Sequence, residues 1–414
     1  MARTSAQPST GAGTFEAEAV DAIAAVRDAF ARIIELKCPG PKAVTGLCDA
    51  FGIHRKLAWQ VSKVAYTEDP FAAARHMPSD KSLSAWLEAA RAVGVPASLI
   101  DAARLAGERF EQIALAHASS RVELDMLLES CGASRDVDAD AKWRQQSFVG
   151  NSYTWGAHCR VLLAMSVLTP SEDRERFFSI VQVRGLIGYR QTRPGVRWLV
   201  NQSVVLDDEA RQTTGLVRTA LDPRAAVGRD GVPVMPAFCS DPVPELTRRV
   251  GADGMVNDEF VSGPVGQTGE RTLITGEMVH NIGAVHATEH DKVAHFGTAV
   301  RIPAEMLHYD MFVRAGMFGD VERELRVFSD IASPVAFDEA DALPVPEGIA
   351  RLGRGVSLAQ TPDVPGYADL AASVFGAIGR DPADYELYRI RMAYPPMPTT
   401  VMVRHDLLEP EPGA

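Results

Sequence analysis

A run of cationic and amide side chains between residues 54 and 63 is the part of this sequence best suited to chemistry. It contains His54, Arg55, Lys56, Gln60 and Lys63. Arginine and lysine pair with guanine edges or phosphates, and glutamine pairs with adenine, so the set matches the groups that a DNA major groove presents. A helix with an apolar opposite side would position these side chains on one face.

Residues 44–63 predict that frame: two short amphipathic helices joined by a tight turn at Gly52. Glycine adopts a positive φ without steric cost and lets the chain turn sharply. The apolar positions that would wedge the helices together are Leu47, Phe51, Ile53, Leu57 and Val61.

The spacing in this stretch is similar to that of a known motif. Leu47 lies five residues before the turn glycine, the small residue Cys48 lies four before it, and Val61 lies nine after it. Residues 44–63 thus resemble the helix-turn-helix of bacterial transcriptional regulators. The resemblance implies binding of double-stranded DNA through Lys42, His54, Arg55, Lys56, Trp59, Gln60 and Lys63.

The same pattern has a structural alternative. Two helices joined by a glycine turn also occur inside helical bundles, with Trp59 then packed in the core. Under that alternative the helical part is a protein–protein module, and the chain is a scaffold or assembly protein without chemistry.

A cluster of histidines indicates an alternative functional site, one that could bind a metal ion. Four of the ten histidines fall within 16 residues, beside acidic side chains: His280, His286, His290 and His295 with Glu277, Glu289 and Asp291. The spacing of His286 and His290 would suit zinc on a helix. We expect a strand–turn–strand hairpin instead, with residues 286–291 as its loop. Along a strand these two histidines would be about 13 Å apart, too far for one metal ion.

Motifs for nucleophiles and nucleotides are absent. The chain has no GxSxG, no GxxxxGK[ST] and no GxGxxG after a strand. We therefore predict no catalytic residue, metal or cofactor. An enzyme that uses the histidine cluster with Glu289 or Asp291 remains the alternative function.

A polar and aromatic patch, residues 151–156 (NSYTWG), has two interpretations. It packs between the halves of the chain, which is the expected role, or it lines a pocket. Only His158 nearby titrates close to neutral pH, which favours packing.

Charge and composition restrict the function classes. The net charge of −12 argues against indiscriminate coating of nucleic acid. Residues 1–64 nevertheless hold 8 Lys and Arg against 6 Asp and Glu, and the acidic remainder would repel DNA. Five scattered cysteines, the absence of a signal peptide and the lack of a long apolar run predict a cytoplasmic protein without a membrane span.

Periodicity and caps predict an α+β multidomain chain. An all-α N-terminal helical unit with a helix-turn-helix precedes a β-rich C-terminal domain. The expected parts are a disordered tail (1–14), a helical domain (15–133), a connector (134–175) and a β-rich domain (176–408). We expect a homodimeric regulator whose β-rich domain senses a small-molecule effector or mediates oligomerisation.

Overall fold

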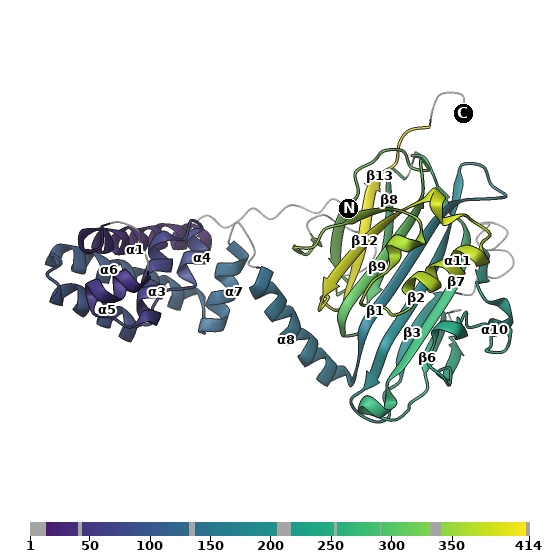
Figure 1. The fold of residues 1–414 in the computed structure, drawn as a ribbon, viewed down its shortest axis with the longest axis horizontal. Helices are drawn as coiled ribbons and strands as arrows, with labels where there is room; N and C mark the ends of the chain where they lie inside the picture. The colour runs from purple at the N-terminus through teal and green to yellow at the C-terminus, as the bar shows by residue number, and fades with distance from the viewer. Residues whose placement is uncertain are drawn as a thin grey trace, which may run out of the picture. The chain divides into compact units, whose positions relative to one another are not determined.

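The chain folds into two compact units, residues 1–137 and 138–414. The computed structural model describes residues 14–39, 44–131, 137–204, 217–251, 255–289, 291–331 and 341–410. The first unit is helical and the second is rich in sheet (Figure 1), which confirms the predicted α+β organisation. Lys42 and the expected tail, except Thr14, lie outside the described residues.

Caps and breakers divide the first unit into short helices. The Asp69 carboxylate accepts a hydrogen bond from the Phe71 N–H at 2.9 Å, and Pro70 begins the helix that follows. The helices are α1 (Phe15–Lys37), α2 (Val44–Phe51), α3 (Arg55–Tyr66), α4 (Pro70–Ala74), α5 (Asp80–Ala92), α6 (Ala97–His117) and α7 (Arg121–Cys131).

The core of the first unit is aromatic. Trp86 on α5 is fully buried, and its ring centroid lies 6.2 Å from that of Phe30 and 4.6 Å from that of Phe51. These rings join α5 to α1 and α2, while α1 packs on α3 and α6. Burial of such side chains supplies most of the free energy that holds short helices together.

The second unit begins with a helix and continues as strands. The helices are α8 (Val137–Trp155), α10 (Pro223–Val227) and α11 (Tyr367–Ala377). The strands are β1 (Ala157–Pro170), β2 (Phe177–Gln191), β3 (Trp198–Val204), β4 (Val217–Ala220), β5 (Leu246–Val250), β6 (Met255–Phe260), β7 (Arg271–Ala284), β8 (Val293–Val300), β9 (Ala304–Arg314), β10 (Glu324–Ser329), β11 (Ala350–Arg354), β12 (Tyr385–Ala393) and β13 (Thr399–Asp406).

These strands form one large sheet and two small ones. The large sheet has the order β11-β12-β9-β1-β2-β7-β4, and the small sheets have the orders β10-β13-β8 and β3-β6-β5. The β1–β9 pair is parallel, whereas the other pairs of neighbouring strands are antiparallel.

The central strand β1 is covered on both faces. Leu163 and Met165 belong to the apolar cluster that includes α11, whereas Leu162 and Ala164 belong to the cluster shared with the small sheets. Figure 1 shows α11 lying across the large sheet. Burial on both faces explains why β1 is an almost continuous apolar run instead of an alternating one.

The expected connector, residues 134–175, is wrong for most of its length. It contains α8 and β1, so the sheet region begins at Ala157 and not at residue 176. The apolar run of β1 lacks the period of two that identifies a half-buried strand, because both of its faces are covered. The expected β-rich domain also contains one longer helix, α11.

Ion pairs anchor the segment before α11 to β9 and β12. Arg389 on β12 donates to both carboxylate oxygens of Asp310 on β9, at 2.8 and 2.7 Å, and Asp310 is fully buried. Arg391 donates to both oxygens of Asp363 at 2.6 and 2.8 Å. Each arginine compensates the buried charge of its carboxylate through two hydrogen bonds. Removal of either partner would leave the other charge buried and uncompensated.

Candidate functional site

The turn between α2 and α3 has the conformation that the sequence predicts. Gly52 has φ +66°, and its N–H donates to the Cys48 carbonyl at 2.8 Å. His54 then caps α3, because its Nδ1 accepts a hydrogen bond from the Leu57 N–H at 3.2 Å. The turn glycine is thus confirmed, and His54 has a structural role that the sequence did not indicate.

Helix α3 has a clean division between its two sides. At about 100° per residue, the buried positions occupy an arc of about 120°, and the polar positions together with Trp59 occupy a separate arc of about 140°. The buried residues are Leu57, Ala58, Val61, Val64 and Ala65. The opposite arc holds Arg55, Lys56, Trp59, Gln60 and Lys63.

The predicted DNA-binding side chains that the structure describes are on the surface. His54, Arg55, Lys56 and Lys63 are exposed, and Gln60 is half-buried. Trp59 is 42% exposed, and its ring meets that of His76 in a T-shaped contact with centroids 4.9 Å apart. The alternative in which Trp59 fills the core of a bundle is therefore wrong.

The cations of α3 are available for other partners. Arg55, Lys56 and Lys63 form no ion pair with any residue in the described ranges. Asp49 on α2 is also exposed but does not pair with them. This face is a candidate nucleic-acid interface, since unpaired exposed cations can neutralise phosphates without first breaking an internal ion pair.

The histidines of the rival site do not converge. His280 on β7 bonds with Thr219, with Nε2 and Oγ1 3.0 Å apart, and His295 is on β8. His286 lies in the loop between these strands, and His290 lies outside the described residues. Within the described part of the chain, no three His, Cys, Asp or Glu side chains are placed to hold a metal ion.

The hairpin that we expected around these histidines is also wrong. Strand β7 belongs to the large sheet, whereas β8 pairs with β13 in a small sheet. Strands β7 and β8, although consecutive in the sequence, therefore belong to different sheets. Local alternation predicted the two strands correctly, but pairing depends on β13, which is about 100 residues further along the chain.

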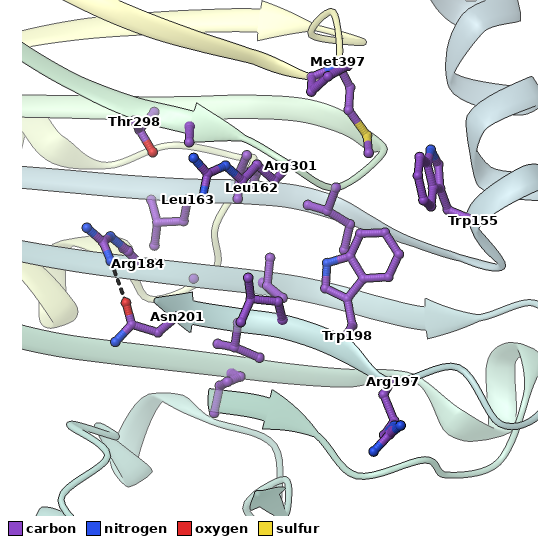
Figure 2. A pocket seen from close by; sticks show the side chains of 18 of the residues that line it. Trp155, Leu162, Leu163, Arg184, Arg197, Trp198, Asn201, Thr298, Arg301 and Met397 are labelled. Atoms are coloured by element: carbon purple, nitrogen blue, oxygen red, sulfur yellow. Dashed lines mark hydrogen bonds between the residues drawn. The ribbon is translucent and has the colours of Figure 1, made fainter. Parts of the chain in front are cut away.

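A cavity in the second unit is a further candidate site. It has a volume of about 760 Å³, within the range of small-molecule pockets, and lies where β1, β2, β3, β7 and β8 meet (Figure 2). Its apolar wall consists of side chains from these strands and from the segments before β9 and β13: Leu162, Leu186, Val200, Leu273, Ile302 and Met397.

One end of the cavity is polar and holds an arginine. Arg184 Nη1 donates to Asn201 Oδ1 at 2.6 Å, and Nη2 donates to Gln182 Oε1 at 3.0 Å. Asn201 in turn donates to Asp258 at 3.4 Å, and Arg248 binds both oxygens of Asp258 at 2.7 and 2.9 Å. The charge of Asp258 is therefore already neutralised by Arg248. Among the described side chains, Arg184 donates hydrogen bonds only to amide oxygens.

Burial and nearby charge act on the Arg184 guanidinium. Burial lowers the pKa of Arg184, the carboxylate of Glu277 raises it, and the cations Arg218 and Arg301 lower it. Glu277 is itself paired with Arg218 at 2.7 Å. The polar end of the cavity thus carries positive charge in partly desolvated surroundings.

The other end of the cavity is aromatic. In Figure 2 Trp155 and Trp198 lie toward one side of the cavity, and Arg184 and Asn201 lie toward the other. Trp155 belongs to the polar and aromatic patch at residues 151–156, so the pocket-lining interpretation holds for this residue.

Sequence reasoning missed Arg184. One signal was available, because Arg184 is a cation in the middle of β2 (Phe177–Gln191), between the mostly apolar stretches IVQV and GLIG. A cation at a position predicted to be buried indicates either an internal ion pair or a ligand.

Comparisons with protein-family models, curated proteins and solved structures found no match to this chain. Among the helices in the described part of the chain, none is both long and apolar enough to cross a membrane. The function must therefore be argued from the geometry of the two candidate sites.

Proposed function

We propose that this chain is a sequence-specific DNA-binding transcriptional regulator. In this proposal α2 and α3 form a helix-turn-helix, and α3 enters the major groove. The observation that carries the proposal is the exposed face of α3, where Arg55, Lys56 and Lys63 lack ion-pair partners among the described residues. The second unit would sense an effector or mediate oligomerisation.

The packing of the first unit supports this assignment. Helix α3 packs on α1 and α2, and its apolar side is buried against them. The scaffold thus holds α3 rigidly and leaves its polar side free, which a recognition helix requires. Phosphate contacts would come from Lys42, Arg55, Lys56 and Lys63, and base contacts from His54, Arg55, Trp59 and Gln60.

A homodimer is part of the proposal. One helix-turn-helix contacts only a few base pairs, so two copies would read half-sites about 34 Å apart, one helical turn of DNA. The bound site would then be a palindrome. A footprint that covers a single half-site, with a monomeric protein in solution, would contradict this element and leave the contact face unaffected.

The test is genomic footprinting with the purified full-length protein. We expect protection of a limited set of sites by the wild type and loss of protection in Arg55→Ala/Lys56→Ala. The matched control is Lys81→Ala/Arg91→Ala, which removes two exposed cations from α5. Equal footprints for both double variants, or no protected sites for the wild type at low salt, would overturn the proposal.

A further inference from the structure

We propose that the cavity of the second unit binds an organic monocarboxylate with an apolar body, whose carboxylate lies against Arg184. As an effector site, this cavity rests on the proposed regulator function. Carboxylate binding itself can be measured without DNA, so the two ideas fail independently.

The charged residues that line the cavity favour an anionic ligand. Arg184, Arg197 and Arg301 line the cavity, and no Asp or Glu is among its described lining residues. Residues 138–414 hold 27 Lys and Arg against 37 Asp and Glu, so an excess of cations at one place in this unit is unexpected. A wall of this composition selects an anion.

Arg184 is the residue that would meet the anion. Its guanidinium is held by the Asn201 and Gln182 side chains, and it has no carboxylate partner within the described residues. Arg301 pairs with Asp330, with Nε and Oδ2 3.7 Å apart, and is close enough to Arg184 to lower its pKa. A bound carboxylate would relieve the repulsion between these two arginines and complete a bidentate pair with Arg184.

The shape of the cavity specifies the rest of the ligand. A bulge at Val200 lets Trp198 and Asn201, three residues apart on β3, both line the cavity. They are about 10 Å apart along the strand. The ligand would therefore place its charged group beside Asn201 and Arg184, and its aliphatic or aromatic body toward Trp198 and Trp155 (Figure 2).

The apolar part of the cavity wall argues for a ligand with a single charged group. Leucine, valine, isoleucine and methionine side chains cover the surface between the two ends. A second anionic group on this stretch would be desolvated without a partner, which costs several kcal/mol. Arg197 and Arg301 also line the cavity, but both are exposed, so solvent screens their charge. A polyanion such as a nucleic acid does not fit this distribution.

The experiment compares pairs of probes of equal shape and different charge. Octanoate and 3-phenylpropionate are titrated into the full-length protein by calorimetry, with octanamide and 3-phenylpropionamide as uncharged counterparts. We expect at least one carboxylate to bind tenfold or more tightly than its amide. Equal binding of carboxylate and amide, or no binding of either carboxylate at millimolar concentration, would overturn the proposal.

Variants locate the site. In Arg184→Met the difference between carboxylate and amide should disappear, together with the rise in melting temperature that the carboxylate causes in the wild type. Arg380→Gln, which removes an arginine paired with Glu172 away from the cavity lining, should behave like the wild type. If Arg184→Met does not fold, Arg184→Lys tests the same contact and should weaken carboxylate binding, because lysine cannot form the bidentate pair. Full carboxylate selectivity in a folded Arg184 variant would contradict the assignment.

Discussion

Two sets of cations, one in each unit, lie in opposite surroundings. On α3, Arg55, Lys56 and Lys63 are exposed and form no ion pair within the described residues. In the second unit, Arg389 and Arg248 bind both oxygens of fully buried carboxylates. An exposed, unpaired cation adds little to stability, whereas a buried pair is costly to break.

The difference separates residues that hold the fold from residues that remain available to a partner. By this criterion Arg184 differs from these paired arginines, because it is partly desolvated yet donates only to amide oxygens among the described residues. It resembles the α3 cations in having an incomplete set of contacts, and it differs from them in being enclosed. We infer that α3 suits an extended polyanion and the cavity suits a small anion.

The largest expected effect is on a buried pair. Asp310→Asn leaves Arg389 without its carboxylate, so we expect a loss of about 3–5 kcal/mol in the free energy of unfolding of the second unit. Urea denaturation measures it. The control is Glu172→Gln, in an exposed pair with Arg380, where a change within about 1 kcal/mol is expected. Similar losses of unfolding free energy in the two variants would contradict the claim that the buried ion pair stabilises the fold more than the exposed one.

The next effect concerns the turn that presents α3. Gly52 has φ +66° and no atom within 4 Å of the place where a Cβ would lie, so strain there comes from the backbone alone. Gly52→Val should cost more than about 1 kcal/mol of stability, since β-branched residues are strained at positive φ. Gly52→Asn should cost less, because asparagine tolerates this region. Equal stability of all three proteins in urea denaturation would contradict the account of the turn.

A smaller, pH-dependent effect is expected at Asp363. A hydrogen bond from Arg391 lowers the pKa of Asp363 to about 2, below its usual value of about 3.9. The stabilisation is therefore complete above about pH 4 and is lost as the pH falls toward 2. Asp363→Asn should be less stable than the wild type at pH 7, and the gap should narrow below pH 4. A gap that is constant with pH would show that the ion pair is not its cause.

The sequence predicted the first unit well because its determinants are local. Helix periodicity, the Asp69 cap and the turn glycine each depend on residues a few positions apart, and each is found in the structure. The exposed face of α3 follows directly from the same spacing.

The second unit was predicted only as strands, because its arrangement depends on distant pairs. Strand β8 pairs with β13, and β1 pairs with β9, over more than a hundred residues each. The cavity combines residues from Trp155 to Pro398, so no local pattern marks it. Arg184 was visible as a cation between two mostly apolar stretches of β2, but its amide partner Asn201 comes from a strand of a different sheet.

The most direct test of the central claim is the salt dependence of DNA binding. The proposed contacts of Arg55 and Lys56 with phosphate or bases predict that Arg55→Ala/Lys56→Ala weakens binding roughly tenfold or more, at about 1 kcal/mol or more per contact. If Arg55 and Lys56 both contact phosphates, the magnitude of the slope of log K against log salt concentration should fall by about 2 in the double variant. Stability should stay within about 0.5 kcal/mol of the wild type. An unchanged affinity and slope in the folded double variant would contradict the claim that α3 is the DNA-binding surface.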